Sequence, residues 1–378
     1  MRISVVVSAT VFVLLSSFMA VPATAEDARP VANVNHHVDS LNHPDDPRNL
    51  LPAIQERGTQ KDSLFRVSPL GWLHKSTTKG KQALYEASDV KLGFRFVQLG
   101  QWLSESLPDQ DRSGTSAQAN LVGTWELFHK GKPTQGQFYI DLEGRWNYGT
   151  TGPTPLGANG LGSSIQTANG YAEYTPTFLV RNAYWHQGSK AAGWSYRLGK
   201  ITPDQILQTS AHISPFTTFL PLASTGPFAM GLPDSGYGTV GAWYVNDRTT
   251  LVGLVSDANA DRTDSGDIGE GDFFTAVELH FKIAPRTPKA GYSKITLWHT
   301  DGTKDGQPIN GETGPSGWGV MGKLEQELTA DGRAIGILRY GKSFDESALY
   351  EELASAHFLL YDPPGPSRLK NDLVGAAL

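Results

Sequence analysis

The sequence predicts an all-β fold, an antiparallel transmembrane β-barrel with short periplasmic turns and long extracellular loops. Three observations support this fold class. Segments with alternating apolar and polar residues recur along the chain, as in strands with two unlike faces. Short and long connections alternate, so that the long loops gather at one end of the strands. A chain with 41 glycines, 9 tryptophans, 13 tyrosines and no cysteine fits a β protein better than a helical one.

The N-terminus has the three parts of a secretory signal peptide. Met1-Arg2 is basic, residues 3–21 are mostly apolar, and Ala23-Thr24-Ala25 is an A-x-A site, so cleavage is expected after Ala25. A transmembrane anchor is the weaker interpretation, because no basic stop-transfer cluster follows. Residues 1–25 are therefore a predicted signal peptide, and the mature protein is expected to leave the cytoplasm.

Several function classes have no support in the sequence. The lack of cysteine excludes a disulfide-stapled domain, thiol catalysis and cysteine-ligated metals. A net charge of −6 does not suggest a nucleic-acid partner. No G-x-S-x-G elbow, P-loop, Rossmann glycine pattern or H-E-x-x-H motif occurs. We therefore predict that the protein is not an enzyme and has neither a cofactor nor catalytic residues.

The rest of the chain is divided into a lead and a barrel. Residues 26–88 are predicted to be an N-terminal periplasmic extended or helical segment, with a helix-forming composition at 81–88. Residues 89–378 are predicted to form the barrel, with about thirteen strands bounded by turn residues. These strands are expected at 90–98, 120–128, 136–148, 177–187, 193–201, 237–245, 249–257, 272–282, 291–300, 317–327, 333–341, 353–361 and from 372 onward.

The connections between these strands fall into two groups. The short ones are residues 129–135, 188–192, 246–248, 283–290, 328–332 and 362–371. The long ones are residues 102–119, 149–176, 202–236, 258–271 and 301–316. Because antiparallel neighbours turn at opposite ends, this alternation sorts the loops by length, which a soluble sandwich has no reason to do.

Residues 135–148, QGQFYIDLEGRWNY, show the strand pattern most clearly. In lipid a sheet can span only as a closed barrel, because every backbone polar group must be bonded within the protein. The apolar side of the sheet then faces acyl chains and the polar side faces the lumen. The residues expected to face lipid are Phe138, Ile140, Leu142, Trp146 and Tyr148, and those expected inside include Glu143 and Arg145.

Later strands repeat the pattern with charged residues on one face. The residues predicted to line the lumen are Asp141, Glu278, His280, Lys282, Lys294, Lys323 and Glu325. Near strand ends, Tyr148, Trp194 and Trp318 suit the aromatic girdles of a membrane barrel. Segments 240–245 and 251–255 are apolar on both faces and fit a barrel or a sandwich equally well.

Two long connections have compositions that suggest a role. Residues 202–236 are predicted to fold into the barrel and set its diameter, because Phe216, Phe219, Leu220 and Phe228 would be unfavourable in water. The alternative is a surface loop packed on itself.

Asp257, Asn259 and Asp261 have calcium-loop spacing. The sixth position of that loop is an arginine and the twelfth an isoleucine, so a hydrated extracellular loop without metal is expected.

Four segments carry a resemblance to a known family. They are FYIDLEGRWNYGT from residue 138, WSYRLGKI from 194, SPFTTFL from 214 and LPDSGYGTVGAWYV from 232. In their order and spacing, the chain from about Ser68 onward resembles the carbohydrate-selective outer-membrane porins, the OprB family. The resemblance implies an outer-membrane β-barrel, usually drawn with sixteen strands, through which glucose and related neutral sugars diffuse passively.

The resemblance also implies where the pore is narrow. The family constricts its pore where long loops fold inward over lumen arginines and a glutamate. By position, the residues that match this constriction are Glu143, Arg145, Arg197 and Lys200. An arginine fork can bridge neighbouring sugar hydroxyls, and a carboxylate supplies the acceptor. The alternative is that Glu143 and Arg145 belong to a charge ladder that only solvates the wall.

Two points depart from the family pattern or leave its implications open. Only about thirteen strands are expected and the chain ends in LVGAAL without an aromatic residue, so we expect a barrel that is incomplete at its C-terminus. A general porin, or one for another solute, is the alternative function. An outer-membrane barrel enzyme or adhesin acting through its extracellular loops is the more distant one. The expected partners are neutral sugars and outer-membrane lipid, with a homotrimer as the assembly to test.

Overall fold

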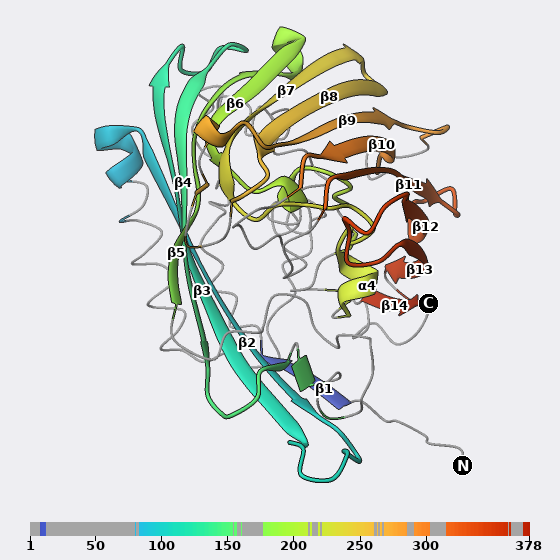
Figure 1. Cartoon of the computed structure of the whole chain (residues 1–378). Helices are drawn as coiled ribbons and strands as arrows, with labels where there is room; N and C mark the ends of the chain where they lie inside the picture. Colours follow the sequence, from blue (N-terminus) through green and yellow to red (C-terminus); the bar gives the residue numbers. More distant parts are fainter. Residues whose placement is uncertain are drawn as a thin grey trace.

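The protein forms one meandering antiparallel sheet in which strands follow one another in sequence order (Figure 1). The computed structural model describes residues 8–12, 80, 83–153, 155–156, 160, 177–210, 212–213, 218–219, 221–260, 263, 265–266, 268–285, 291–302, 315–361, 363 and 373–378. The sheet curves around an interior, with β2–β5 on one side and β11–β14 on the other. No helix in these described residues has the length and apolar character needed to cross a membrane.

β2–β5 are the longest strands, with 12–16 residues each, whereas β6–β13 have 8–11 and the outermost strands β1 and β14 have 5 each. The strands are β1 (Ser8–Phe12), β2 (Val90–Trp102), β3 (Ser113–Phe128), β4 (Gly136–Asn147), β5 (Thr177–Ser189), β6 (Trp194–Ile201), β7 (Gly236–Asn246), β8 (Thr249–Asp257), β9 (Phe273–Phe281), β10 (Ser293–Thr300), β11 (Gly317–Glu327), β12 (Ala334–Ser343), β13 (Glu352–Tyr361) and β14 (Leu373–Ala377). Short helical segments are η3 (Lys190–Ala192), η4 (Pro203–Gln205), α4 (Leu222–Thr225) and η5 (Ile268–Glu270). Residues 83–88 are also helical, within the predicted helix at 81–88.

The strands expected from the sequence correspond one to one to β2–β14, so the fold-class prediction is confirmed. The first long loop was predicted too long. β2 continues to Trp102 and β3 begins at Ser113, and these two residues are paired across the strands. Residues 113–119 are small and polar, which suggested a loop, but backbone pairing to β2 holds them in the sheet. β1 lies within the predicted signal peptide and pairs with β2, and cleavage after Ala25 stays a prediction.

The two faces of the sheet are inverted relative to a water-soluble domain. On the outer face, Phe178 is 86% exposed, Trp243 62% and Leu297 58%. On the inner face, Glu278 is 0% exposed and Lys294 1%. Large apolar side chains thus point away from the protein and charged ones point into it, as in a sheet whose outer solvent is lipid.

The strand at 136–147 follows the alternation that its sequence predicts. Phe138 and Leu142 are exposed on the outer face, Trp146 is half-buried, and Glu143 is buried on the inner face. A second protein layer over Phe138 and Leu142 would have contradicted the barrel. These two side chains instead remain open to the surroundings.

Exposed aromatic residues lie near both ends of the strands. Tyr148, directly after β4, and Trp318, near the start of β11, lie at the end that carries the long loops. Trp318 stacks on Phe344 with ring centroids 4.3 Å apart. Trp194 begins β6 at the opposite end and pairs in register with Trp243 of β7. This arrangement matches the two aromatic girdles of membrane barrels.

The segments that are apolar on both faces have a structural explanation. Their outer residues are exposed, whereas Val240 of β7 and Leu254 of β8 are buried on the inner face. There they belong to one apolar cluster with Leu207, Met230 and Leu232, which come from the connection between β6 and β7. These strands need an apolar inner face because a loop packs on it.

Candidate functional site

The connection between β6 and β7 is residues 202–235, and its described residues lie in the interior of the sheet. We call it the inward loop. Phe228 is buried, and Phe219 packs against an inner cluster that includes Ile337 and Leu359. This agrees with the predicted inward fold, whereas a surface loop packed only on itself would not touch these strands. Phe216 and Leu220 lie outside the described residues.

The second half of the inward loop is held by two side chains of the sheet, one on β12 and one on β13. Arg339 of β12 donates to the carbonyl oxygens of Ser224, at 3.2 Å, and Gly226, at 2.7 Å. His357 Nε2 of β13 lies 2.9 Å from the same Ser224 oxygen. These contacts place α4 beside β13 and fix its last carbonyl groups.

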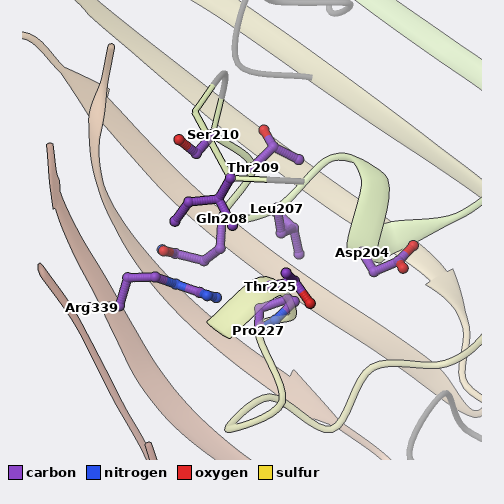
Figure 2. A pocket seen from close by; sticks show the side chains of 9 residues that line it. Asp204, Leu207, Gln208, Thr209, Ser210, Thr225, Pro227 and Arg339 are labelled. Carbon is purple, nitrogen blue, oxygen red and sulfur yellow. The ribbon is translucent and has the colours of Figure 1, made fainter. Parts of the chain in front are cut away.

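A small pocket lies between the inward loop and β12 (Figure 2). Arg339 lies on one side, with Gln208 next to it and Asp204 on the opposite side. Burial raises the pKa of the Asp204 carboxyl, which the neighbouring Arg181 guanidinium only partly opposes. The remaining lining residues are Leu207, Ser210, Ile213, Thr225 and Pro227.

The first half of the inward loop is bonded to three successive strands through Gln208. Its backbone N–H donates to Glu278 Oε2 of β9 at 2.7 Å. Its side-chain amide donates to Thr296 Oγ1 of β10 at 2.7 Å and to the Met321 carbonyl of β11 at 3.1 Å. One residue of the loop therefore crosses the interior face of β9, β10 and β11.

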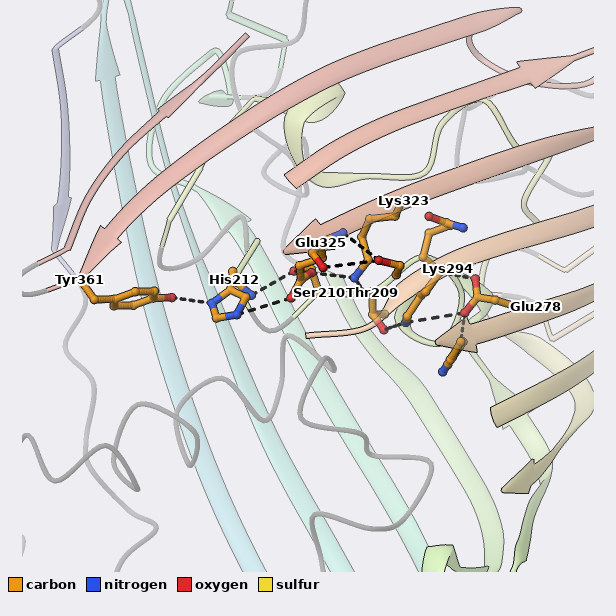
Figure 3. A network of polar contacts seen from close by, with 11 residues as sticks. Thr209, Ser210, His212, Glu278, Lys294, Lys323, Glu325 and Tyr361 are labelled. Carbon is orange, nitrogen blue, oxygen red and sulfur yellow. Dashed lines mark hydrogen bonds and ion pairs between the residues drawn. The ribbon is translucent and has the colours of Figure 1, made fainter. Parts of the chain in front are cut away.

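The next two loop residues meet a buried charge network (Figure 3). Ser210 donates to Glu325 Oε2 at 2.7 Å, and Lys323 Nζ lies 2.9 Å from the same oxygen. Lys323 also donates to the Thr209 carbonyl at 2.7 Å. Lys294 donates to Thr209 Oγ1 at 2.8 Å. Buried charges are costly unless they are paired and hydrogen-bonded, and here the loop supplies part of the hydrogen bonding.

The network continues at both ends. His212 Nδ1 lies 2.7 Å from the Tyr361 hydroxyl of β13, and its Nε2 lies 3.5 Å from Glu325 Oε1 (Figure 3). On the other side, His280 Nε2 lies 2.5 Å from Glu278 Oε1. The chain of contacts runs from β9 to β13, and we call this side the covered wall.

The opposite side of the interior carries a separate cluster on β2, β3 and β4. Arg145 donates to Glu143 Oε1 at 2.7 Å. Gln118 and Asn120 donate to Glu143 Oε2 at 2.6 and 3.1 Å. The cluster continues to Arg95, which donates to Asn120 at 2.8 Å. We call it the β2–β4 cluster, and it offers fixed donors and acceptors side by side.

The four predicted constriction residues fall into two places. Glu143 and Arg145 are adjacent in the β2–β4 cluster. Arg197 and Lys200 are buried on β6, where the Arg197 guanidinium lies 5.0 Å from the ring centre of Tyr184. The ring of Tyr184 stacks on Tyr139, at a centroid distance of 4.7 Å. The first pair thus forms an ion pair and Arg197 forms a cation–π contact.

The residues predicted to line the lumen are distributed between the two sides. Asp141 belongs to the β2–β4 cluster and accepts a hydrogen bond from Asn120 at 2.9 Å. Those on the covered wall contact one another or the inward loop: Glu278, His280, Lys294, Lys323 and Glu325. Lys282 follows β9, and its ammonium lies 4.4 Å from the Tyr292 ring centre. That any of them lines open water stays a prediction.

Sequence reasoning missed several residues of the site. Arg181 of β5 is bonded to Asp234 near the end of the inward loop. A β-bulge at this point turns both Arg181 and Asn182 inward, whereas simple alternation from Asn182, Tyr184 and His186 would place Arg181 on the outer face. His212 and Arg339 were missed because only the folded loop gives them partners. The alternation in 90–98 would have identified Arg95.

The acidic connection after β8 is folded rather than hydrated at its start. Asp257 is buried and accepts the backbone N–H of Asn259 at 2.7 Å. The Asn259 side chain donates to Glu270 at 3.1 Å and Asp272 at 3.2 Å. Asp261 lies outside the described residues. Across the residues that the structure describes, no group of acidic or histidine side chains has the arrangement of a metal site.

Comparison with known proteins supports the fold. No protein-family model matches the sequence, and no curated protein matches it. A high-pH structure of Pseudomonas putida OprB is similar, with a TM-score of 0.62 and 10% identity over 79% of this chain and 76% of that one. A low-pH structure of the same protein aligns over 84% of this chain and 83% of that one, with 9% identity and a TM-score of 0.45. The chain has an OprB-like fold.

Proposed function

We propose that this chain is an outer-membrane porin through which neutral sugars such as glucose diffuse passively. The observation that carries the proposal is the inverted sheet, with exposed apolar residues outside and buried charges inside, together with a loop packed into its interior. An apolar outer face suits lipid, and an inward loop narrows a barrel to the size of a small solute. The OprB-like fold supports the same proposal.

The β2–β4 cluster is the proposed contact for the solute. A sugar is uncharged and carries hydroxyl groups that both donate and accept hydrogen bonds. Arg145 offers donors and Glu143 offers acceptors within 2.7 Å of each other, so the pair can meet neighbouring hydroxyls. The two charges also neutralise each other, which disfavours tight binding of ions. Such contacts are weak enough for release, as diffusion through a channel requires.

Single-channel recording in planar bilayers tests the proposal. The purified protein should give a steady conductance that glucose or an oligosaccharide partly blocks. A steady conductance that no sugar affects would favour a general porin or one for another solute. Heat-modifiable migration on a gel shows whether the protein is folded. If folded protein gives no conductance, the channel is rejected and a barrel enzyme or adhesin is favoured.

The proposed partners are neutral sugars and outer-membrane lipid, and a homotrimer is the assembly that we propose to test. Light scattering of the detergent-solubilised protein measures its mass directly. A mass of three chains would support the trimer, and a mass of one chain would reject it without affecting the proposed channel.

A further inference from the structure

The residue Arg181 occupies an unusual place in β5. Where β4 pairs with β5, Asp141 lies opposite Asn182 and Leu142 lies opposite Val180, which leaves Arg181 as the extra residue of a β-bulge. Val180 is exposed on the outer face, whereas Arg181 and Asn182 are consecutive and both buried. The bulge therefore turns one additional side chain into the interior, a common use of bulges next to functional sites.

This additional side chain meets the inward loop at both of its ends. The Arg181 Nη1 donates to Asp234 Oδ1, two residues before β7. Its Nη2 lies 3.7 Å from Asp204 Oδ1, three residues after β6. The side chains of Arg181 and Asp234 are 6% and 4% exposed, so this ion pair is shielded from water.

Backbone and amide contacts support the same junction. Thr202, the first residue of the loop, donates to the Arg181 carbonyl at 3.0 Å. The Asn182 side chain donates to Gln205 at 3.0 Å. In the pairing of β4 with β5, Asn182 lies opposite Asp141, which accepts a hydrogen bond from Asn120 of the β2–β4 cluster. The junction thus connects the loop to the β2–β4 cluster.

We propose that Arg181 is a positioning residue that holds both ends of the inward loop together and thereby sets the width and sugar selectivity of the pore. We call Arg181, Asp204 and Asp234 the clasp. The inference rests on the proposed function. Arginine suits the role because its planar fork can reach two carboxylates at once, whereas the lysine ammonium is a single point charge. The shielded Asp234 is the stronger partner and the more distant Asp204 the weaker one.

The clasp predicts how conductance and loop exposure change together. Arg181→Gln and Asp234→Asn should each raise the single-channel conductance, increase its fluctuations and weaken the sugar block. Because both remove the same contact, the double variant should change little more than either single variant. Arg181→Lys should lie between the wild type and Arg181→Gln. Arg333→Gln removes a cation from an exposed turn between β11 and β12 and is the matched control.

A second measurement is independent of conduction. The chain has no cysteine, so Ser224→Cys in α4 provides a single, nearly isosteric thiol on the inward loop. Adding Arg181→Gln should raise the rate of labelling by a water-soluble maleimide about tenfold, which corresponds to about 1.4 kcal/mol. Adding Arg333→Gln should leave the rate unchanged.

The outcomes separate the two proposals. If the wild type conducts but Arg181→Gln and Asp234→Asn keep its conductance, sugar block and labelling rate, the clasp is rejected and the porin stands. If the wild type does not conduct, the porin proposal fails, and with it the pore-setting role of the clasp. In that case the labelling rate still decides whether Arg181 holds the loop.

Discussion

The two inner walls of the sheet are both charged, but their charges have different partners. In the β2–β4 cluster, Glu143 is bonded by side chains of its own wall, namely Gln118, Asn120 and Arg145. On the covered wall, Glu278 and Glu325 also accept hydrogen bonds from the inward loop. Glu143 thus takes its hydrogen bonds from its own wall, whereas Glu278 and Glu325 depend on the loop for part of theirs.

Under the proposed function, this difference gives the charged inner face two uses in one molecule. Charges that are satisfied within their own wall remain in position when a solute passes, so they can act on it. Charges that are satisfied by a loop fix that loop, and in doing so they shape the space that remains. Because the loop also covers apolar residues such as Val240 and Leu254, it is built into the core rather than laid over it.

The largest expected effect is on the stability of the covered wall. Glu325→Ala removes an acceptor shared by Ser210 and Lys323 and leaves the Lys323 ammonium buried without that partner. Breaking a buried pair in this way costs about 3–5 kcal/mol. We expect a loss of that size in the free energy of unfolding, measured by urea titration in lipid vesicles with tryptophan fluorescence as the signal.

A substitution in the β2–β4 cluster should lower the free energy of unfolding by less than one on the covered wall. Arg145→Ala should cost about 1–3 kcal/mol, because it removes a charged hydrogen bond from a side chain that is 11% exposed. Glu351→Ala, which removes a carboxylate that is 79% exposed, is the control and should change stability little. Equal losses from Glu325→Ala and Arg145→Ala would contradict the distinction between the walls.

A smaller effect is expected on sugar binding. For this property, substitutions in the β2–β4 cluster should matter more than those on the covered wall. Arg145→Ala and Glu143→Ala should each weaken the block of conductance by sugar about fivefold, the equivalent of one net hydrogen bond of about 1 kcal/mol. Lys282→Ala, which removes a cation just beyond β9, is the matched control. An unchanged block in both β2–β4 variants would show that this site assignment is wrong. An equal effect of Lys282→Ala would favour a charge ladder that only solvates the wall.

The features that sequence reasoning identified are those that depend on local patterns. Alternation over a few residues placed Phe138 outside and Glu143 inside, and turn residues marked every strand from β2 to β14. Strand ends were less certain, since Ser113 and its small polar neighbours lack the composition of a strand and are held there by β2.

The features that were missed depend on contacts between distant parts of the chain. His212 meets Tyr361, and Arg339 meets Ser224 and Gly226, only because the loop folds inward. The phenylalanines of the loop predicted that it folds inward, but they did not predict which residues it contacts. Arg181 was missed for a different reason, because a single bulge changes which residues point inward and leaves no mark in the alternation.

The smallest expected effect concerns Asp204, which lies at the start of the inward loop near Arg181 of β5. Burial raises the pKa of its carboxyl above the ordinary value of 3.8, so the folded protein holds this proton more tightly than the unfolded chain does. The stabilising contribution of the protonated group is therefore complete below pH 3.8 and is lost as the pH rises through the raised pKa.

Asp204→Asn removes this titration. The variant should have nearly wild-type stability in acid and be slightly more stable than the wild type at neutral pH, as measured by urea unfolding at a series of pH values. Its conductance should rise less than that of Asp234→Asn, because Asp234 rather than Asp204 makes the close contact with Arg181. A loss of stability at neutral pH, together with a rise in conductance as large as that of Asp234→Asn, would mean instead that the ion pair between Arg181 and Asp204 outweighs the cost of burying the carboxylate. The two ends of the loop would then contribute equally to holding it.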